Sequence, residues 1–301
     1  MDVAPLKVCI VYSYPSSKGL GAWLRCCISL CYFCMKNGWL FDVDFSDHPI
    51  GNYLEETKHV IDKIYKTRSE FDLKLIAQRF TGIKDVIFVD HELEVTNPSP
   101  TDNAVNVKVY QEIVSKILRY NSNFLSKKDS ALVNKQYKQA LHVRLGDIVL
   151  IDERDICIYT KESLYQAIDK YIQGNNPRDT VIVCDSYWIK QTLCEKYGFV
   201  MIDTRPSHSS LLTDEDSIID TLIDFYVMCN SRSIHVIHGV KYTSSFSLVP
   251  HVLYNIPHSK EELVIKPSPG ICWNCRKLKL RSVRNLHHYV VCGIAEQNTI
   301  G

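Results

Sequence analysis

Short runs of apolar, β-branched residues alternate along the chain with stretches in which apolar positions recur every three or four residues. The runs predict strands at residues 6–12, 40–44, 85–89, 140–143, 180–184, 199–202 and 234–237. The stretches between them predict helices at residues 20–35, 53–66, 71–80, 103–120, 127–139, 161–173, 187–197, 217–229 and 247–254. Alternating strands and helices are typical of an α/β fold, and near-continuous apolar strands are typical of parallel sheets covered on both faces.

The alternation is interrupted once, by a proline-containing loop at residues 97–100 and two polar helices, and it resumes at residue 140. We therefore expect two Rossmann-like, doubly wound lobes with a cleft between them. The expected ranges are 1–135 for the first lobe, 136–265 for the second and 266–301 for a tail. Ligands of such sheets bind beyond the carboxyl ends of the strands, so residues that follow strands are the first site candidates.

Net charge and the length of the apolar runs argue against some classes of protein. Lysine plus arginine is 35 and aspartate plus glutamate is 34, a net charge of +1 that argues against nucleic acid as the partner. The apolar run at residues 20–35 contains Arg25 and is shorter than the roughly 20 residues that span a bilayer. With no secretory signal visible, we expect a cytoplasmic protein without a transmembrane segment, in which most of the 12 cysteines are reduced core residues.

The first candidate segment is Gly19-Leu20-Gly21 at the start of a helix. Paired glycines allow a sharp turn and a close backbone approach, and a helix start favours an anion such as a diphosphate. An ordinary turn explains the same residues.

The second candidate segment, from His142 to Asp147, follows a strand. Strand alternation turns His142 and Arg144 toward a common side, and a bend at Gly146 adds Asp147 as a carboxylate beside the arginine. An arginine fork there suits a diphosphate leaving group, whereas the alternative is a structural salt bridge at the sheet end.

The third candidate segment is the hydroxyl-rich turn at residues 243–247, which follows the strand at 234–237 and opens a helix. It presents N–H groups and small donors to an anion. Ser244 or Ser245 also suits the simpler role of a helix N-cap.

In this order and spacing, the three segments resemble the fucosyltransferase-like superfamily, over residues 7–257, and the His-x-Arg-x-x-Asp box is the most specific part. The resemblance implies a GT-B-like architecture and an inverting transfer of fucose from GDP-fucose to a glycan acceptor, with no cofactor required for catalysis. It further implies that the first lobe faces the acceptor and the second lobe the nucleotide sugar.

The resemblance also implies roles for individual residues. Arg144 would contact the β-phosphate and stabilise the departing GDP, with His142 and Asp147 shaping the same box. The other implied roles are cleft lining by Gly19 and Gly21, guanine or ribose binding by Asp185, diphosphate binding by Ser244 and Ser245, and support of the site by Asp224.

The general base is left open by the sequence. The resemblance points to Asp152, with Glu153 and Asp155 as competitors in the same loop, and a solvated loop charge is the alternative. Leu145 stands where many relatives carry a second arginine, and Lys241 is a candidate for the missing cation.

The tail carries a separate signal. Cys272, Cys275, His288 and Cys292 have the residue types and nearly the spacing of a structural zinc site, although a chance arrangement without metal is the alternative. Between residues 263 and 295 there are six basic residues and no acidic ones, which makes either a solvated face or a site for an acidic partner.

Two alternatives to a fucosyltransferase remain at this point. One is a catalytically inactive GT-B-like protein that serves as a binding or scaffold module. The other is a glycosyltransferase that uses a different nucleotide sugar.

Overall fold

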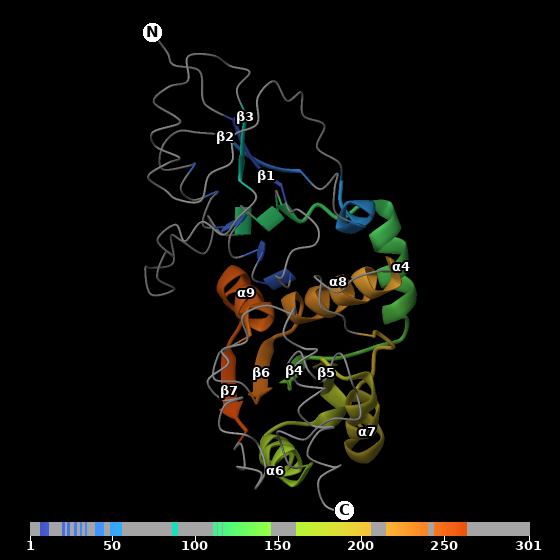
Figure 1. Cartoon of the computed structure of the whole chain (residues 1–301). Coiled ribbons are helices and arrows are strands. Elements are labelled where there is room, and N and C mark those ends of the chain that lie inside the picture. Colours follow the sequence, from blue (N-terminus) through green and yellow to red (C-terminus); the bar gives the residue numbers. More distant parts are fainter. Residues whose placement is uncertain are drawn as a thin grey trace, which may run out of the picture. The chain divides into compact units, whose positions relative to one another are not determined.

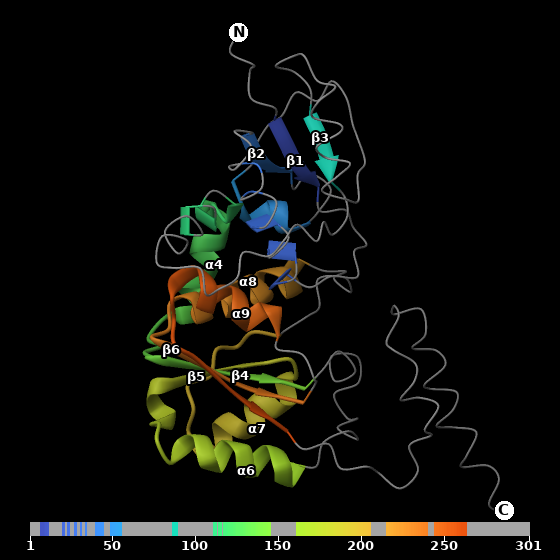
Figure 2. The ribbon, with the colours of Figure 1, turned by 90° about the vertical axis from the view of Figure 1, so that its left-hand side faces the viewer.

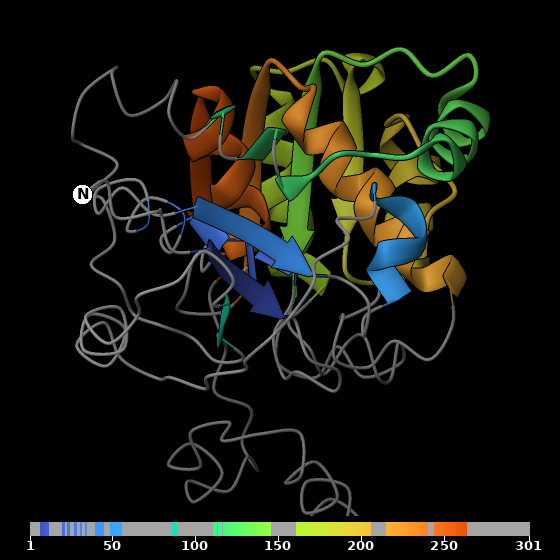
Figure 3. The same cartoon turned by 90° about the horizontal axis from the view of Figure 1, so that it is seen from above.

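The computed structural model describes part of the chain, in which two parallel sheets are visible. The described residues are 7–11, 20–21, 23–24, 27–28, 31, 34, 40–44, 49–55, 86–89, 111–112, 114–115, 117–145, 161–205, 215–239 and 244–263. The first sheet contains β1 (Lys7–Val11), β2 (Leu40–Asp44) and β3 (Val86–Val89). Its order is β2-β1-β3, and β1 runs parallel to both neighbours (Figures 1 and 3).

The second sheet has the strand order of a dinucleotide-binding fold. Its strands are β4 (Gln139–Arg144), β5 (Thr180–Cys184), β6 (Ser233–His238) and β7 (His258–Glu262), all parallel, in the order β5-β4-β6-β7. Val200 extends the sheet beyond β5 through a parallel bridge to Val181. Counted along the chain, the order is 3-2-1-4-5, which is the Rossmann order without its sixth strand.

Helices cover both faces of this sheet, because neighbouring residues of each strand point to opposite sides. Leu141 and Ile182 pack with α6 (Lys161–Ile172) and α7 (Tyr187–Tyr197). Ala140 and Val181 pack with α8 (Glu215–Cys229) and α9 (Ser245–Tyr254). Figures 1 and 2 show the sheet between these two helix pairs. The sheet is therefore doubly wound, which confirms the predicted α/β fold class.

Most predicted elements of the second sheet are confirmed. The strand at 180–184 and the helix at 187–197 have the predicted bounds, and the other matched elements differ by one or two residues at an end. The predicted strand at 199–202 is reduced to the Val200 bridge. The polar edge strand β7 is an addition that the apolar pattern did not predict.

The predicted helix at 127–139 is wrong in its bounds. The helix α4 spans Ser122–Leu132. It starts early because the Asn121 side chain accepts a hydrogen bond from the Phe124 N–H over 3.1 Å and caps the helix. It ends early because Asn134 adopts a left-handed conformation, with φ of 58°, and Gln139 already belongs to β4.

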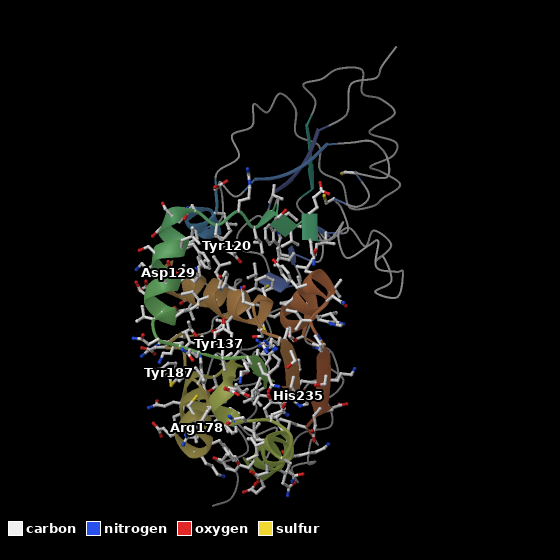
Figure 4. All side chains as sticks on the ribbon, turned by 180° about the vertical axis from the view of Figure 1, so that it is seen from behind. Tyr120, Asp129, Tyr137, Arg178, Tyr187 and His235 are labelled. Atoms are coloured by element: carbon white, nitrogen blue, oxygen red, sulfur yellow. The ribbon has the colours of Figure 1, made fainter. Side chains whose placement is uncertain are left out.

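Apolar residues of the first half of the chain join the core of the second sheet. Leu24, Cys27 and Cys34 are fully buried in the cluster that also contains the inner faces of α8 and α9. The 3-10 helix η1 (Pro49–Tyr53) and α4 contact each other and α8, as Figure 3 shows for α4 and η1. At this contact Tyr120, labelled in Figure 4, stacks on Phe124 with 4.0 Å between the ring centroids.

Cysteines of the described residues behave as core side chains. Cys27, Cys31, Cys34 and Cys184 are buried, and Cys194 and Cys229 are half-buried. Burial raises the pKa of the Cys184 thiol well above its ordinary value. The prediction of cysteines packed in the core is confirmed for the four buried ones, and their reduced state stays a prediction. No helix among the described residues has the length and apolar character needed to cross a membrane.

Candidate functional site

The candidate site lies where the second sheet changes the direction of its connections. From β4 the chain passes to β5 and then to Val200 on one side, and it returns to β6 on the other side of β4. Arg144 and His238 are register partners at the carboxyl ends of β4 and β6, and the Gly239 N–H donates to the Arg144 carbonyl oxygen over 3.0 Å. A doubly wound sheet binds its ligands at this switch point.

Arg144 is held in place by a buried carboxylate on the neighbouring strand. Asp185, which directly follows β5, accepts a hydrogen bond from Arg144 Nη1 over 2.8 Å. Its side chain is 6% exposed, whereas that of Arg144 is 20% exposed. In the structure the Asp185 carboxylate orients Arg144, and the nucleoside binding that the resemblance implies for Asp185 stays a prediction.

Leu145 explains one departure from the family pattern. Its N–H donates to both carboxylate oxygens of Asp185, each at 2.9 Å, and its side chain is buried against α6 and α7. A second arginine at this position would enter an apolar core. The backbone of Leu145 instead adds to the bonds that fix Asp185.

His142 is a buried, neutral histidine on the α9 side of β4. Its ring packs edge-on against Phe246 of α9, with 5.9 Å between the centroids. Burial, reinforced by Arg144, His258 and His238, lowers the pKa of His142 to about 3. Its Nδ1 has no hydrogen-bond partner among the described residues.

The start of α9 lies at the same carboxyl edge, because α9 follows β6. Ser244 is the N-cap residue, but its side chain makes no capping hydrogen bond, and Ser245 is the first residue of the helix. The Ser244 carbonyl oxygen accepts from the N–H groups of Ser247 and Leu248. Anion binding by the first N–H groups of α9, and by Ser244 and Ser245, stays a prediction from the sequence.

Gly21 brings the N-terminal helical segment directly onto the start of α9. A Cβ atom added to Gly21 would lie 2.4 Å from the Phe246 nitrogen and 2.5 Å from the Ser245 carbonyl carbon. Only a residue without a side chain permits this approach of two backbones. Gly21 thus contacts the predicted diphosphate segment, and the structure connects it through Phe246 to His142.

A second, deeper cluster surrounds Asp224 in the third turn of α8. Lys190 of α7 is 0% exposed, and its Nζ lies 2.5 Å from Thr204 Oγ1 and 3.7 Å from Asp224 Oδ1. The Thr204 hydroxyl donates to Asp224 Oδ1 over 2.6 Å. Asp224 Oδ2 is buried and has no hydrogen-bond partner in the described part of the chain. Lys190 could not be predicted from the sequence, because its position in α7 gives no signal of burial.

The segment 203–205 is fixed between α7 and α8 on both sides of Thr204. The Tyr187 hydroxyl, beside α7 in Figure 4, donates to Asp203 Oδ1 over 2.6 Å. The Arg205 N–H donates to Asp220 Oδ2 over 2.7 Å. Burial raises the pKa of Asp220 to about 6.

Several predicted site residues lie outside the described residues, so their roles stay predictions. Across the described ranges, no three histidine, cysteine, aspartate or glutamate side chains are grouped to hold a metal ion. The predicted residues outside these ranges are Gly19, Asp147, Asp152, Lys241, Cys272, Cys275, His288 and Cys292.

Comparison with known proteins finds relatives by structure alone, since no family model and no curated sequence matches the chain. The structure resembles the α-1,6-fucosyltransferase NodZ soaked with GDP-fucose, with a TM-score of 0.51 and 13% identity over 83% of this chain and 92% of that one. NodZ from Bradyrhizobium in its selenomethionine form gives 0.50 and 12% over the same shares. A variant of Arabidopsis thaliana FUT1 in complex with GDP gives 0.50 and 9%, over 88% of this chain and 72% of that one.

The chain has the fold of these fucosyltransferases. The resemblance of the three sequence segments and the likeness of the structures therefore point to one architecture by separate routes. At identities of 9–13% the likeness establishes the fold, and the function has to be argued from the site.

Proposed function

We propose that the protein is an inverting glycosyltransferase that transfers fucose from GDP-fucose to a glycan acceptor. The observation that carries the proposal is Arg144 at the switch point, oriented by buried Asp185 at the sheet edge from which the chain continues into α9. A fixed guanidinium and the N–H groups at a helix start suit the diphosphate of a departing nucleotide. NodZ, which has this fold, has been studied with GDP-fucose.

In this proposal, catalysis depends on charge stabilisation without a metal. As the glycosidic bond to the diphosphate breaks, negative charge develops on the β-phosphate, and Arg144 stabilises it together with the first N–H groups of α9. Because Asp185 fixes the guanidinium beforehand, little reorganisation is needed at the transition state. Asp152 is the proposed base that removes the acceptor proton, with Glu153 and Asp155 as alternatives.

The unpartnered buried atoms of the site suit a guanine base. Asp224 Oδ2 and His142 Nδ1 belong to residues on the face of the sheet that α8 and α9 cover. Guanine offers N–H donors at N1 and N2 for a carboxylate, and an acceptor at O6 for an imidazole N–H. Guanine bound at either residue would satisfy an atom whose burial without a partner costs free energy.

Thermal unfolding with GDP, UDP, GDP-fucose and GDP-mannose tests the proposal. A ligand at 100 times its dissociation constant adds about 2.7 kcal/mol to the free energy of unfolding, so GDP and GDP-fucose should raise the melting temperature and UDP should not. Absence of any shift with a guanine nucleotide would contradict the proposal.

The same samples separate the alternatives. Stabilisation by GDP-mannose but not GDP-fucose indicates another donor. Stabilisation by GDP-fucose without its turnover in the presence of glycan acceptors indicates a binding or scaffold protein. Cytoplasmic location and the zinc site of the tail stay predictions from the sequence.

A further inference from the structure

Lys190 is a charged side chain that the proposed reaction does not use. A lysine is almost never fully buried unless it is paired, because removing its ammonium group from water is costly. Its Nζ meets three acceptors, namely the hydroxyl and carbonyl oxygens of Thr204 and the Oδ1 atom of Asp224. The lysine therefore links α7, the segment 203–205 and α8.

Both contacts to Asp224 fall on the same carboxylate oxygen. Thr204 Oγ1 and Lys190 Nζ lie 2.6 and 3.7 Å from Oδ1. Oδ2, by contrast, has no partner among the residues that the structure describes, although it is shut off from water. A carboxylate held on one side in this way keeps one oxygen in a fixed place for the N–H donors of a ligand.

We propose that Lys190 and Thr204 are positioning residues that keep the Asp224 carboxylate ionised and turn Oδ2 toward the N1 and N2 donors of guanine. The inference rests on the proposed function and deepens it, because it names the residues that decide base selectivity. Lys190 acts through Asp224 and does not itself touch the nucleotide.

The electrostatics of Asp224 support this role. Burial raises the pKa of Asp224, whereas Lys190 and the Thr204 hydroxyl lower it. The other titratable neighbours are Asp220, one turn earlier on α8, and Cys184 at the end of β5. Without Lys190, the carboxyl group takes up a proton at higher pH, and a protonated carboxyl group accepts fewer N–H bonds.

The test replaces Lys190 by methionine, which fills a similar space without charge. GDP affinity and affinity for inosine diphosphate, which lacks the N2 amino group, are measured by calorimetry between pH 6 and pH 9. Lys190→Met should bind GDP about tenfold more weakly at pH 6, the usual value of one charge-assisted hydrogen bond. The loss should shrink as the pH rises, and the preference for GDP over inosine diphosphate should fall with it.

Lys196→Met is the matched control, since Lys196 belongs to the same helix but is exposed. It should bind both nucleotides as the unchanged protein does. A Lys190→Met protein with the GDP affinity, selectivity and pH profile of the unchanged protein overturns the inference and leaves the proposed function intact. If the unchanged protein binds no GDP, the proposed function fails, and the inference fails with it.

A second pair of variants covers the case in which Lys190→Met does not fold. Thr204→Val removes the hydroxyl that donates to Asp224 Oδ1, while Thr204→Ser keeps it. Thr204→Val should lose GDP selectivity with the same pH dependence, and Thr204→Ser should restore it. Equal selectivity in the two variants would also overturn the inference.

Discussion

Lys138 directly precedes β4 and Arg144 is its last residue. Each forms an ion pair with an aspartate next to β5. The pair of Lys138 Nζ with Asp179 Oδ2, at 2.7 Å, lies at the amino edge with side chains 55% and 37% exposed. An exposed pair of this kind contributes about 0–1 kcal/mol to stability. At the carboxyl edge, Asp185 is buried and also accepts from the Leu145 N–H. The two ion pairs have similar distances, but only the pair of Arg144 with Asp185 fixes a cation at the switch point.

Replacing Arg144 tests this assignment at the scale of one residue. Arg144→Ala should reduce turnover of GDP-fucose by two orders of magnitude or more, since a preorganised donor to developing charge typically contributes about that much. Circular dichroism should show a folded protein, because Asp185 keeps its bonds to the Leu145 N–H. Lys138→Ala, which breaks the amino-edge pair of the same two strands, is the control and should keep full turnover. Turnover of Arg144→Ala within a few-fold of the unchanged protein would remove Arg144 from the mechanism.

At the scale of elements, the strands and helices that bury an apolar face could be predicted from the sequence. Elements that do not bury such a face could not be predicted. Residues 180–184 are buried along their whole length, so an apolar run revealed β5. The strand β7, His258–Glu262, is a polar edge strand whose place depends on pairing with β6 and not on its own pattern.

The candidate site shows the same division. The placement of Arg144, Asp185 and Ser244 at the carboxyl edge could be predicted, because each lies at or beyond the end of a strand in a doubly wound sheet. Their roles in binding stay predictions. The ion pair of Arg144 with Asp185 on the neighbouring strand could not be predicted, because the sequence pointed to Asp147, which lies outside the described residues and stays a prediction. Lys190 had no signal at all, because its burial depends on Thr204 and Asp224, which are distant in the sequence.

Gly21 gives a prediction whose sign depends on the contact between elements. Within a helix, glycine to alanine ordinarily stabilises a protein by about 0.5–1 kcal/mol. At Gly21 the added methyl group would lie 2.4–2.6 Å from backbone atoms of Ser245 and Phe246, so Gly21→Ala should instead destabilise by about 1–3 kcal/mol. Gly174→Ala is the control, since a Cβ there meets nothing within 4 Å, and it should change stability by less than about 0.5 kcal/mol. Urea unfolding measures the free energy of unfolding of the three proteins. A Gly21→Ala protein more stable than its parent would contradict the close approach of Gly21 to the backbone of Ser245 and Phe246.

Across the whole molecule, buried titratable groups affect acid stability in opposite directions. Burial lowers the pKa of His142 to about 3 and that of His258 to about 4, so each is neutral in the folded protein and charged in the unfolded chain below pH 6.5. As the pH falls through that range, protonation of the unfolded chain reduces stability. Burial raises the pKa of Asp220 to about 6, so the folded protein takes up this proton first and gains stability over part of the same range. The change in the free energy of unfolding of the unchanged protein at acidic pH is thus the sum of a loss from the two histidines and a gain from Asp220.

Replacing His142 isolates its contribution to the pH dependence of the free energy of unfolding. His142→Gln keeps a side chain of similar size but no group that titrates, while Asp220 and His258 are present in both proteins and largely cancel in the comparison. Above pH 7, where histidine is neutral in both states, the difference in free energy of unfolding between the two proteins should be constant. Between pH 6.5 and about pH 3, the free energy of unfolding of the parent should fall relative to that of His142→Gln by about 1.4 kcal/mol per pH unit. The reason is that His142 takes up a proton in the unfolded parent but stays neutral in the folded parent. Urea unfolding at pH 8, 7, 6 and 5 measures this slope. A difference that stays flat from pH 8 to pH 5 would show that His142 is solvated and can be charged in the folded protein, which would also remove it from the buried base site.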